Sequence, residues 1–271
     1  MRTTLAVVCL LALFAPSARA LNFFELEVYP ATTEGKGLHE IESLTTFVAD
    51  GRHPTEEEEE GEEPIRHRLL RTSLEYNYGL TDKIDIAAYI DLQHENGDDF
   101  EYAGARFRAR GALWDKGRFP VDLGWYFEAE VPHHTESDLE LEFKPLLSRD
   151  LGKLSIDLNP TFELPTVSEE RRTLEFNYAA RLYYRLSDVV QPGLEFYGGI
   201  GQIRDVDPGQ EQEHYIFPVV YARLFDGLKL AAGPGFGLTH NSDNVILKCH
   251  VEWEFTLGGH GSAAPSRPSM Y

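Results

Sequence analysis

Alternation of apolar and polar residues marks the last regular stretch of the chain, residues 245–255. Its apolar face carries Val251 and Trp253, and its polar face carries His250 and Glu252. Because successive side chains of a strand point to opposite faces, this stretch predicts a strand with one apolar side. A strand of roughly 9 to 11 residues crosses an outer membrane at a tilt, with lipid on one face and a polar lumen on the other. We therefore predict a membrane-spanning strand with Trp253 at the periplasmic interface.

The same alternation recurs along most of the chain and predicts twelve strands. They are expected at 37–50, 70–78, 83–92, 105–113 and 121–131, and around LELEFKPLL, LSIDLNPTFEL, LEFNYAARLYYRL, LEFYGGIG, YIFPVVYARL, LKLAAGPGFGL and VILKCHVEWEF. Every second connection is longer and polar, namely 51–64, 93–101, 132–138, 165–173, 204–213 and 239–244. This asymmetry is typical of outer-membrane barrels, and a soluble β-sandwich does not explain it. The predicted fold is an all-β, transmembrane, antiparallel up-and-down β-barrel of about 12 strands.

Four prolines fall inside predicted strands, where each removes a donor from the hydrogen-bond ladder. They are Pro145, Pro160, Pro218 and Pro234. We expect β-bulges or shifted strand boundaries at these positions.

The N-terminus predicts export. Arg2, the apolar run 5–15 and the Ala18–Arg19–Ala20 site form a signal peptide over residues 1–20, cleaved after Ala20. Residues 21–36 form an extended segment that lies either inside or outside the lumen. The barrel is expected over 37–255, and a disordered periplasmic tail over 256–271. The expected location is the bacterial outer membrane.

The charge balance narrows the expected partners. The signal peptide contributes two of the 25 basic residues and no acid, which leaves 23 against 45 acidic residues and a net charge near −22. Such a charge repels phosphate backbones, so nucleic acid is excluded as a partner, and cations are favoured. The expected partners are outer-membrane lipid, the barrel-assembly machinery and a small-molecule solute. No cofactor is expected.

The inward faces of the predicted strands carry charges of both signs. The candidate lumen-lining residues are Arg106, Arg108, Arg110, Asp122, Tyr126, Glu128, Glu130, Lys144, Asp157, Arg181, Arg185, Glu195 and Glu252. Hairpin geometry predicts the three arginines beside Asp122 and Glu128. It also predicts Lys144 near Asp157, and Arg185 near Glu195. Two interpretations follow. Salt-bridged packing could fill a narrow barrel, or the charges could face one another across a pore that selects small polar or anionic solutes.

Histidines and acids gather in the long connections without metal-ligand spacing, so no metal site is predicted there. The histidines are His53, His94, His133, His134, His214 and His240. His133, His134 and Ser137 share one loop but form no triad pattern, and we expect no histidine on the lipid face. The protein is therefore not expected to be an enzyme, and an outer-membrane lipid hydrolase is the weakest alternative.

Several motifs point to a known family. The opening TTEGKGLHEIES, the turn YGLTDKIDI, the block NYAARLYYRLSDVVQPGLEFYGGIG and the closing GPGFGLTHNSD resemble the outer-membrane barrels of the meta-pathway phenol-degradation family and its uncharacterised, transporter-like relatives. The resemblance implies a channel or transporter for small compounds, aromatic ones included, and carries over no site residues. The alternative is a structural or plugged barrel without transport.

Overall fold

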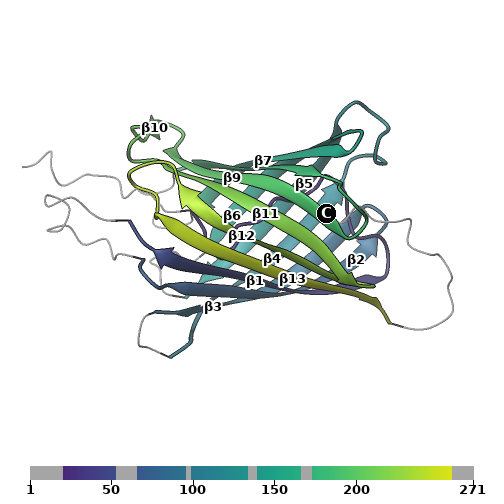
Figure 1. The fold of residues 1–271 in the computed structure, drawn as a ribbon, viewed down its shortest axis with the longest axis horizontal. Coiled ribbons are helices and arrows are strands. Elements are labelled where there is room, and N and C mark those ends of the chain that lie inside the picture. The colour runs from purple at the N-terminus through teal and green to yellow at the C-terminus, as the bar shows by residue number, and fades with distance from the viewer. Residues whose placement is uncertain (1–20, 53–65, 96–98, 134–138, 166–172, 258–271) are drawn as a thin grey trace, which may run out of the picture.

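The chain forms a closed antiparallel barrel of twelve strands (Figure 1). This computed structural model describes residues 21–52, 66–95, 99–133, 139–165, 173–257. The barrel strands are β1 (Leu38–Asp50), β2 (Leu70–Thr81), β3 (Ile84–His94), β4 (Glu101–Ala112), β5 (Asp122–Pro132), β6 (Glu140–Leu151), β7 (Leu154–Pro165), β8 (Glu175–Tyr184), β9 (Val190–Gln202), β11 (Glu213–Phe225), β12 (Leu228–Gly237) and β13 (Val245–Thr256). A two-residue strand, β10 (Asp205–Val206), pairs with β9 outside the ring. The pairings β1–β13 and β8–β9 complete the ring, which confirms the predicted fold.

Alternation along the sequence produces the two faces of the wall. In β4, Arg106 is completely buried in the interior, whereas Phe107 is 61% exposed on the outside. Apolar side chains such as Phe127 and Trp253 are also exposed, as expected of a surface that contacts lipid. Within the described part of the chain, no helix is long and apolar enough to cross a membrane.

The connections divide the barrel into two ends. Three of them, residues 82–83, 152–153 and 226–227, are two-residue turns at one end, which we call the turn end. The opposite, loop end carries the connections predicted to be longer, including the one that contains β10 (Figure 1). The strands before and after the turn at 82–83 extend to Thr81 and Ile84, so this turn is tighter than the predicted Gly79–Asp82. The signal peptide, the acidic run 53–65 and most of the tail lie outside the described residues.

Two seams interrupt the ladder where prolines face each other. Between β6 and β7, pairing passes from Phe143–Phe162 directly to Leu147–Leu158, around Pro145 and Pro160. Between β11 and β12 there is a corresponding gap around Pro218 and Pro234. The register is the same on both sides of each gap. The expected bulges are therefore wrong here, because the missing N–H groups remove ladder bonds without inserting a residue.

Candidate functional site: the lumen and its N-terminal segment

The extended segment of residues 21–36 runs through the barrel from one end to the other. At the loop end, Asn22 Nδ2 donates a hydrogen bond to Glu130 Oε2 over 3.2 Å. At the turn end, the backbone N–H of Gly37 donates to the carbonyl of Gly79 over 2.7 Å, just before β1 begins. A Cβ on Gly79 would lie 1.7 Å from the carbonyl oxygen of Gly35, so this close approach requires glycine.

Side chains of the wall satisfy the backbone of this segment. Asn159 accepts from the N–H of Tyr29 over 2.7 Å and donates to its carbonyl over 2.9 Å. Ser148 Oγ accepts from the N–H of Ala31 over 2.8 Å, and Lys248 Nζ donates to the carbonyl of Leu26 over 2.7 Å. These contacts replace a strand ladder, because buried backbone groups need partners. The segment is thus held in a defined position by polar side chains from several strands.

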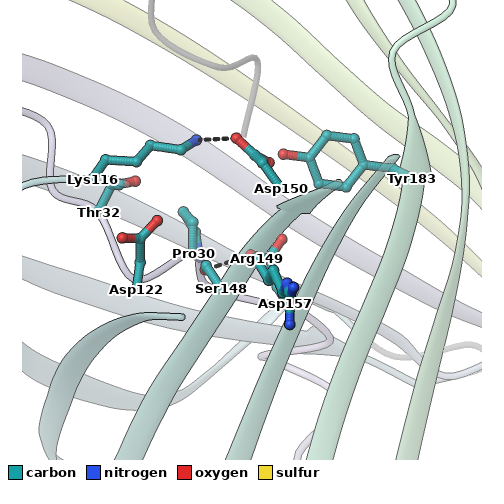
Figure 2. Close-up of a pocket in the computed structure, with 9 residues that line it drawn as sticks. All are labelled: Pro30, Thr32, Lys116, Asp122, Ser148, Arg149, Asp150, Asp157 and Tyr183. Atoms are coloured by element: carbon teal, nitrogen blue, oxygen red, sulfur yellow. Dashed lines mark hydrogen bonds and ion pairs between the residues drawn. The ribbon is translucent and has the colours of Figure 1, made fainter. Parts of the chain in front are cut away.

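Figure 2 shows where the segment approaches the turn end. Pro30 lies near the inward residue Ser148, and Thr32 lies near Asp122, around a cavity of about 10 Å³. Ser148 Oγ also donates to Asp157 over 2.5 Å.

Glu25 anchors the segment to the centre of the wall. Its carboxylate accepts from Arg106 over 2.7 Å, from Lys144 over 2.6 Å and from the hydroxyl of Tyr126 over 2.8 Å. Arg106 is fully buried, and Glu25 and Lys144 are nearly so. Charge-assisted hydrogen bonds of this length are among the strongest that proteins form. The segment therefore supplies a negative charge to two buried cations of the wall.

The arginine ladder of β4 pairs mainly with acids of β2 and β3. Arg106 Nε donates to Asp91 over 2.9 Å, and Arg108 Nη2 donates to Glu75 over 2.5 Å. Arg110 Nη2 donates to Asp85 over 2.9 Å and to Glu34 of the segment over 3.2 Å.

The predicted neighbours of this ladder on β5 are only partly present. Glu128 lies 3.5 Å from Arg106. Asp122 does not meet the arginines and instead accepts from the N–H of Gly117 over 2.7 Å. The reason is the register, which pairs Arg110 with Tyr126, four residues beyond Asp122.

Two other predicted pairs are wrong. Lys144 does not pair with Asp157, because the register of β6 and β7 places Ser148 opposite Asp157. Asp157 accepts instead from Arg181 over 2.8 Å. Arg185 does not reach Glu195, because it follows the end of β8 and lies 3.6 Å from Asp150 at the turn end.

The remaining candidates face the interior. Glu195 accepts from Lys248 over 2.5 Å, and Glu252 accepts from Lys229 over 2.5 Å. Glu130 holds Asn22, as described above. Sequence reasoning missed Glu25 and Asn159, although the alternating FFELEVYP already places Glu25 among apolar residues.

A cavity of about 220 Å³ opens at the loop end beside the start of the segment. Its lining includes Leu21 and Asn22. The charged residues around it are Arg66, Arg71, Glu128, Glu130, Glu140, Glu142 and Glu163. Arg66 is also tied to the connection before β13 through Asp243, over 3.1 Å. This cavity is therefore a polar vestibule with more acids than bases.

Among the described residues, the groups of side chains that could hold a metal ion contain no histidine. His214 Nε2 lies 2.9 Å from Gln212, and its Nδ1 lies 3.1 Å from the hydroxyl of Tyr178. The expectation of no outward histidine is wrong at strand ends, because His39 of β1 and His214 of β11 lie on the side opposite their buried neighbours. His39 shares the outward side of β1 with Ile41, and its Nδ1 lies 2.6 Å from the hydroxyl of Tyr76. His53, His134 and Ser137 lie outside the described residues.

Comparison with known proteins supports the fold. No protein-family model matches the chain, so the expected family resemblance gains no support from that comparison. No curated protein matches it either. Among solved structures, the chain is similar to the COG4313 outer membrane channel from Pseudomonas putida F1, with 12% identity over 85% of this chain and 100% of that chain and a TM-score of 0.58. It is also similar to the NanC porin, with 8% identity over 81% of this chain and 100% of that chain and a TM-score of 0.55. At these identities, the similarity shows that the chain has the fold of bacterial outer-membrane β-barrels.

Proposed function

We propose that this protein is an outer-membrane channel for small polar solutes, closed by residues 21–36 and opened when that segment leaves the lumen. One observation carries the proposal: a separate segment fills the lumen. A purely structural barrel could fill its interior with side chains of its own strands. Here the wall is a complete ring without the segment. Non-covalent contacts hold the segment inside the ring, and the chain connects the two only before β1.

The charges of the lumen suggest which solutes would pass. The vestibule at the loop end is lined by five glutamates and two arginines. A cleft lined by an excess of one charge concentrates solutes of the opposite charge. We therefore expect small neutral or cationic polar solutes to pass more readily than anions. Passage of aromatic compounds, which the sequence motifs imply, would require them to cross this polar interior.

Planar-bilayer recording tests the proposal directly. We expect the full-length mature barrel to be closed for most of the time, and a variant without residues 21–31 to conduct continuously with a preference for cations. Heat-modifiable migration on gels must show that the shortened variant is folded, because its lumen loses the contacts made by Glu25.

A reversible lock serves as a second test. In a Cys249→Ser background, Ala31→Cys and Ser148→Cys would place two thiols at a contact where the backbone N–H now lies 2.8 Å from Oγ. We expect the oxidised form to stay closed and the reduced form to regain channel openings. A folded shortened variant that never conducts would reject the channel and leave a structural barrel. If the full-length, shortened and locked forms conduct equally, the protein is a channel but the segment does not close it.

A further inference from the structure

Three glutamates meet where the N-terminal segment passes β1 and β2. Glu27 comes from the segment, and Glu42 and Glu75 are register partners on the two strands. One carboxylate oxygen from each lies within 4.8 Å of the others. Ionised carboxylates this close repel one another, and burial strengthens the repulsion, so the group needs a cation or shared protons.

Two similar groups of glutamates in the lumen are supplied with cations by the protein itself. The first contains Glu25, Glu128 and Glu142, and the second contains Glu34, Glu40 and Glu254. In the first, Lys144 contacts both Glu25 and Glu142, over 2.6 and 2.7 Å. In the second, Lys229 binds Glu254 and Arg110 binds Glu34.

The group of Glu27, Glu42 and Glu75 has fewer contacts with basic side chains. Among the described residues, Arg108 donates a charge-assisted hydrogen bond to this group, at Glu75 Oε1 over 2.5 Å. The other oxygen of Glu75 is buried without a hydrogen-bond partner, in a side chain that is only 3% exposed. A buried carboxylate oxygen without a hydrogen-bond partner, in a residue that belongs to a group of acids, favours a bound cation.

A buried histidine and a cavity next to the group point the same way. His250 is 3% exposed, its Nδ1 lies 3.9 Å from Glu42 Oε1, and its Nε2 has no hydrogen-bond partner in the described structure. Glu27 and Glu42 also border a cavity of about 60 Å³. Its charged lining consists of Glu27, Glu34, Glu40, Glu42, Glu252, Arg108, Arg110 and Lys229. Five carboxylates thus face three basic groups, beside a space that gives an ion access.

We propose that Glu27, Glu42 and Glu75 bind a divalent cation inside the barrel. Carboxylate oxygens are the ligands that hard divalent cations prefer, and the nearby imidazole of His250 is compatible with Mn²⁺, which accepts both ligand types. Because Glu27 belongs to the segment and the other two belong to the wall, the bound ion joins the segment to β1 and β2. The site exists whether or not the barrel transports solutes.

Electron paramagnetic resonance with Mn²⁺ as the probe tests the site on the full-length barrel after removal of metals by chelation. We expect one Mn²⁺ per chain to lose its free-ion signal. Glu27→Gln and Glu42→Gln should each weaken binding by about tenfold or more, because affinity follows the number of charged ligands. Glu142→Gln is the matched control, since it removes a buried lumen glutamate whose neighbour Lys144 belongs to the protein. Its affinity should match that of the unmodified chain.

The variants separate the outcomes. Glu27 belongs to the segment and not to a strand of the wall, so Glu27→Gln tests the site even if Glu42→Gln fails to assemble. No binding of Mn²⁺ at millimolar concentration by the folded, unmodified chain would overturn the proposal and leave shared protons as the account of the group. Binding that neither variant weakens would also overturn it, by placing the ion elsewhere, for example in the acidic run of residues 56–60.

Discussion

Replacement of Glu25 by glutamine should release the N-terminal segment without damage to the wall. Glu25 is the segment's contact with both Arg106 and Lys144, over 2.7 and 2.6 Å. Glutamine keeps the shape and one acceptor oxygen but removes the negative charge. The two buried cations keep partners on the wall, because Arg106 still binds Asp91 and Lys144 still binds Glu142.

The expected effect follows from the energy of such contacts. A hydrogen bond to a charged group contributes about 1.5–3 kcal/mol, and removal of one partner from a buried ion pair costs about 3–5 kcal/mol. Glutamine retains part of this interaction, so we take about 1.5–3 kcal/mol as the loss of docking free energy. Since about 1.4 kcal/mol corresponds to a factor of ten, the ratio of undocked to docked segment should rise roughly ten- to a hundredfold.

Single-channel recording measures this ratio as open probability. Glu142→Gln is a control that should affect docking of the segment in the opposite direction. It removes the wall carboxylate that competes with Glu25 for the ammonium group of Lys144. We expect Glu25→Gln to open more often than the unmodified chain, and Glu142→Gln to open as rarely or more rarely. If the variant without residues 21–31 conducts but Glu25→Gln stays as closed as the unmodified chain, Glu25 does not hold the segment and the reasoning fails.

Two further predictions concern the wall. Phe107→Arg places a charge on the outward face near the middle of β4 and should cost about 2–4 kcal/mol, which we expect to reduce the yield of heat-modifiable barrel, whereas Phe107→Leu should assemble normally. In a Cys249→Ser background, a cysteine at Gln210 of the loop end should react with a membrane-impermeant maleimide on intact cells, and a cysteine at Lys153 of the turn end should not; the reverse labelling would invert the topology.

The strands of the wall could be predicted from sequence because the pattern that specifies each strand lies within that strand. Each strand repeats a two-residue pattern, so the faces of β4 follow from whether a residue number is odd or even, as Arg106 and Phe107 show. The alternation of connection lengths then gives the two ends. The prolines show the limit of this reasoning. Their positions are clear from the sequence, but the gap in the ladder where Pro145 and Pro160 face each other depends on two strands at once.

The contacts inside the lumen could not be predicted in the same way. Hairpin reasoning considers one neighbour at a time, whereas Arg106 binds Asp91 on one neighbouring strand, lies near Glu128 on the other and also binds Glu25 of the segment. Arg185 shows a different error, since alternation places it on the inward face although β8 ends one residue earlier. Composition could not reveal that residues 21–36 supply part of the lumen's charge balance.

Under the proposed function, the two interpretations of the lumen charges correspond to two states of one arrangement. With the segment docked, Arg106 and Lys144 share Glu25, and the interior is salt-bridged packing. With the segment withdrawn, the same cations keep Asp91 and Glu142 on the wall, so the ring retains partners for its buried charges while its interior becomes a polar passage. A wall that depended on the segment for all of its charge compensation could not lose it and remain folded. The duplication of partners at Arg106 and Lys144 is therefore the property that would let this barrel be closed in one state and remain stable in the other.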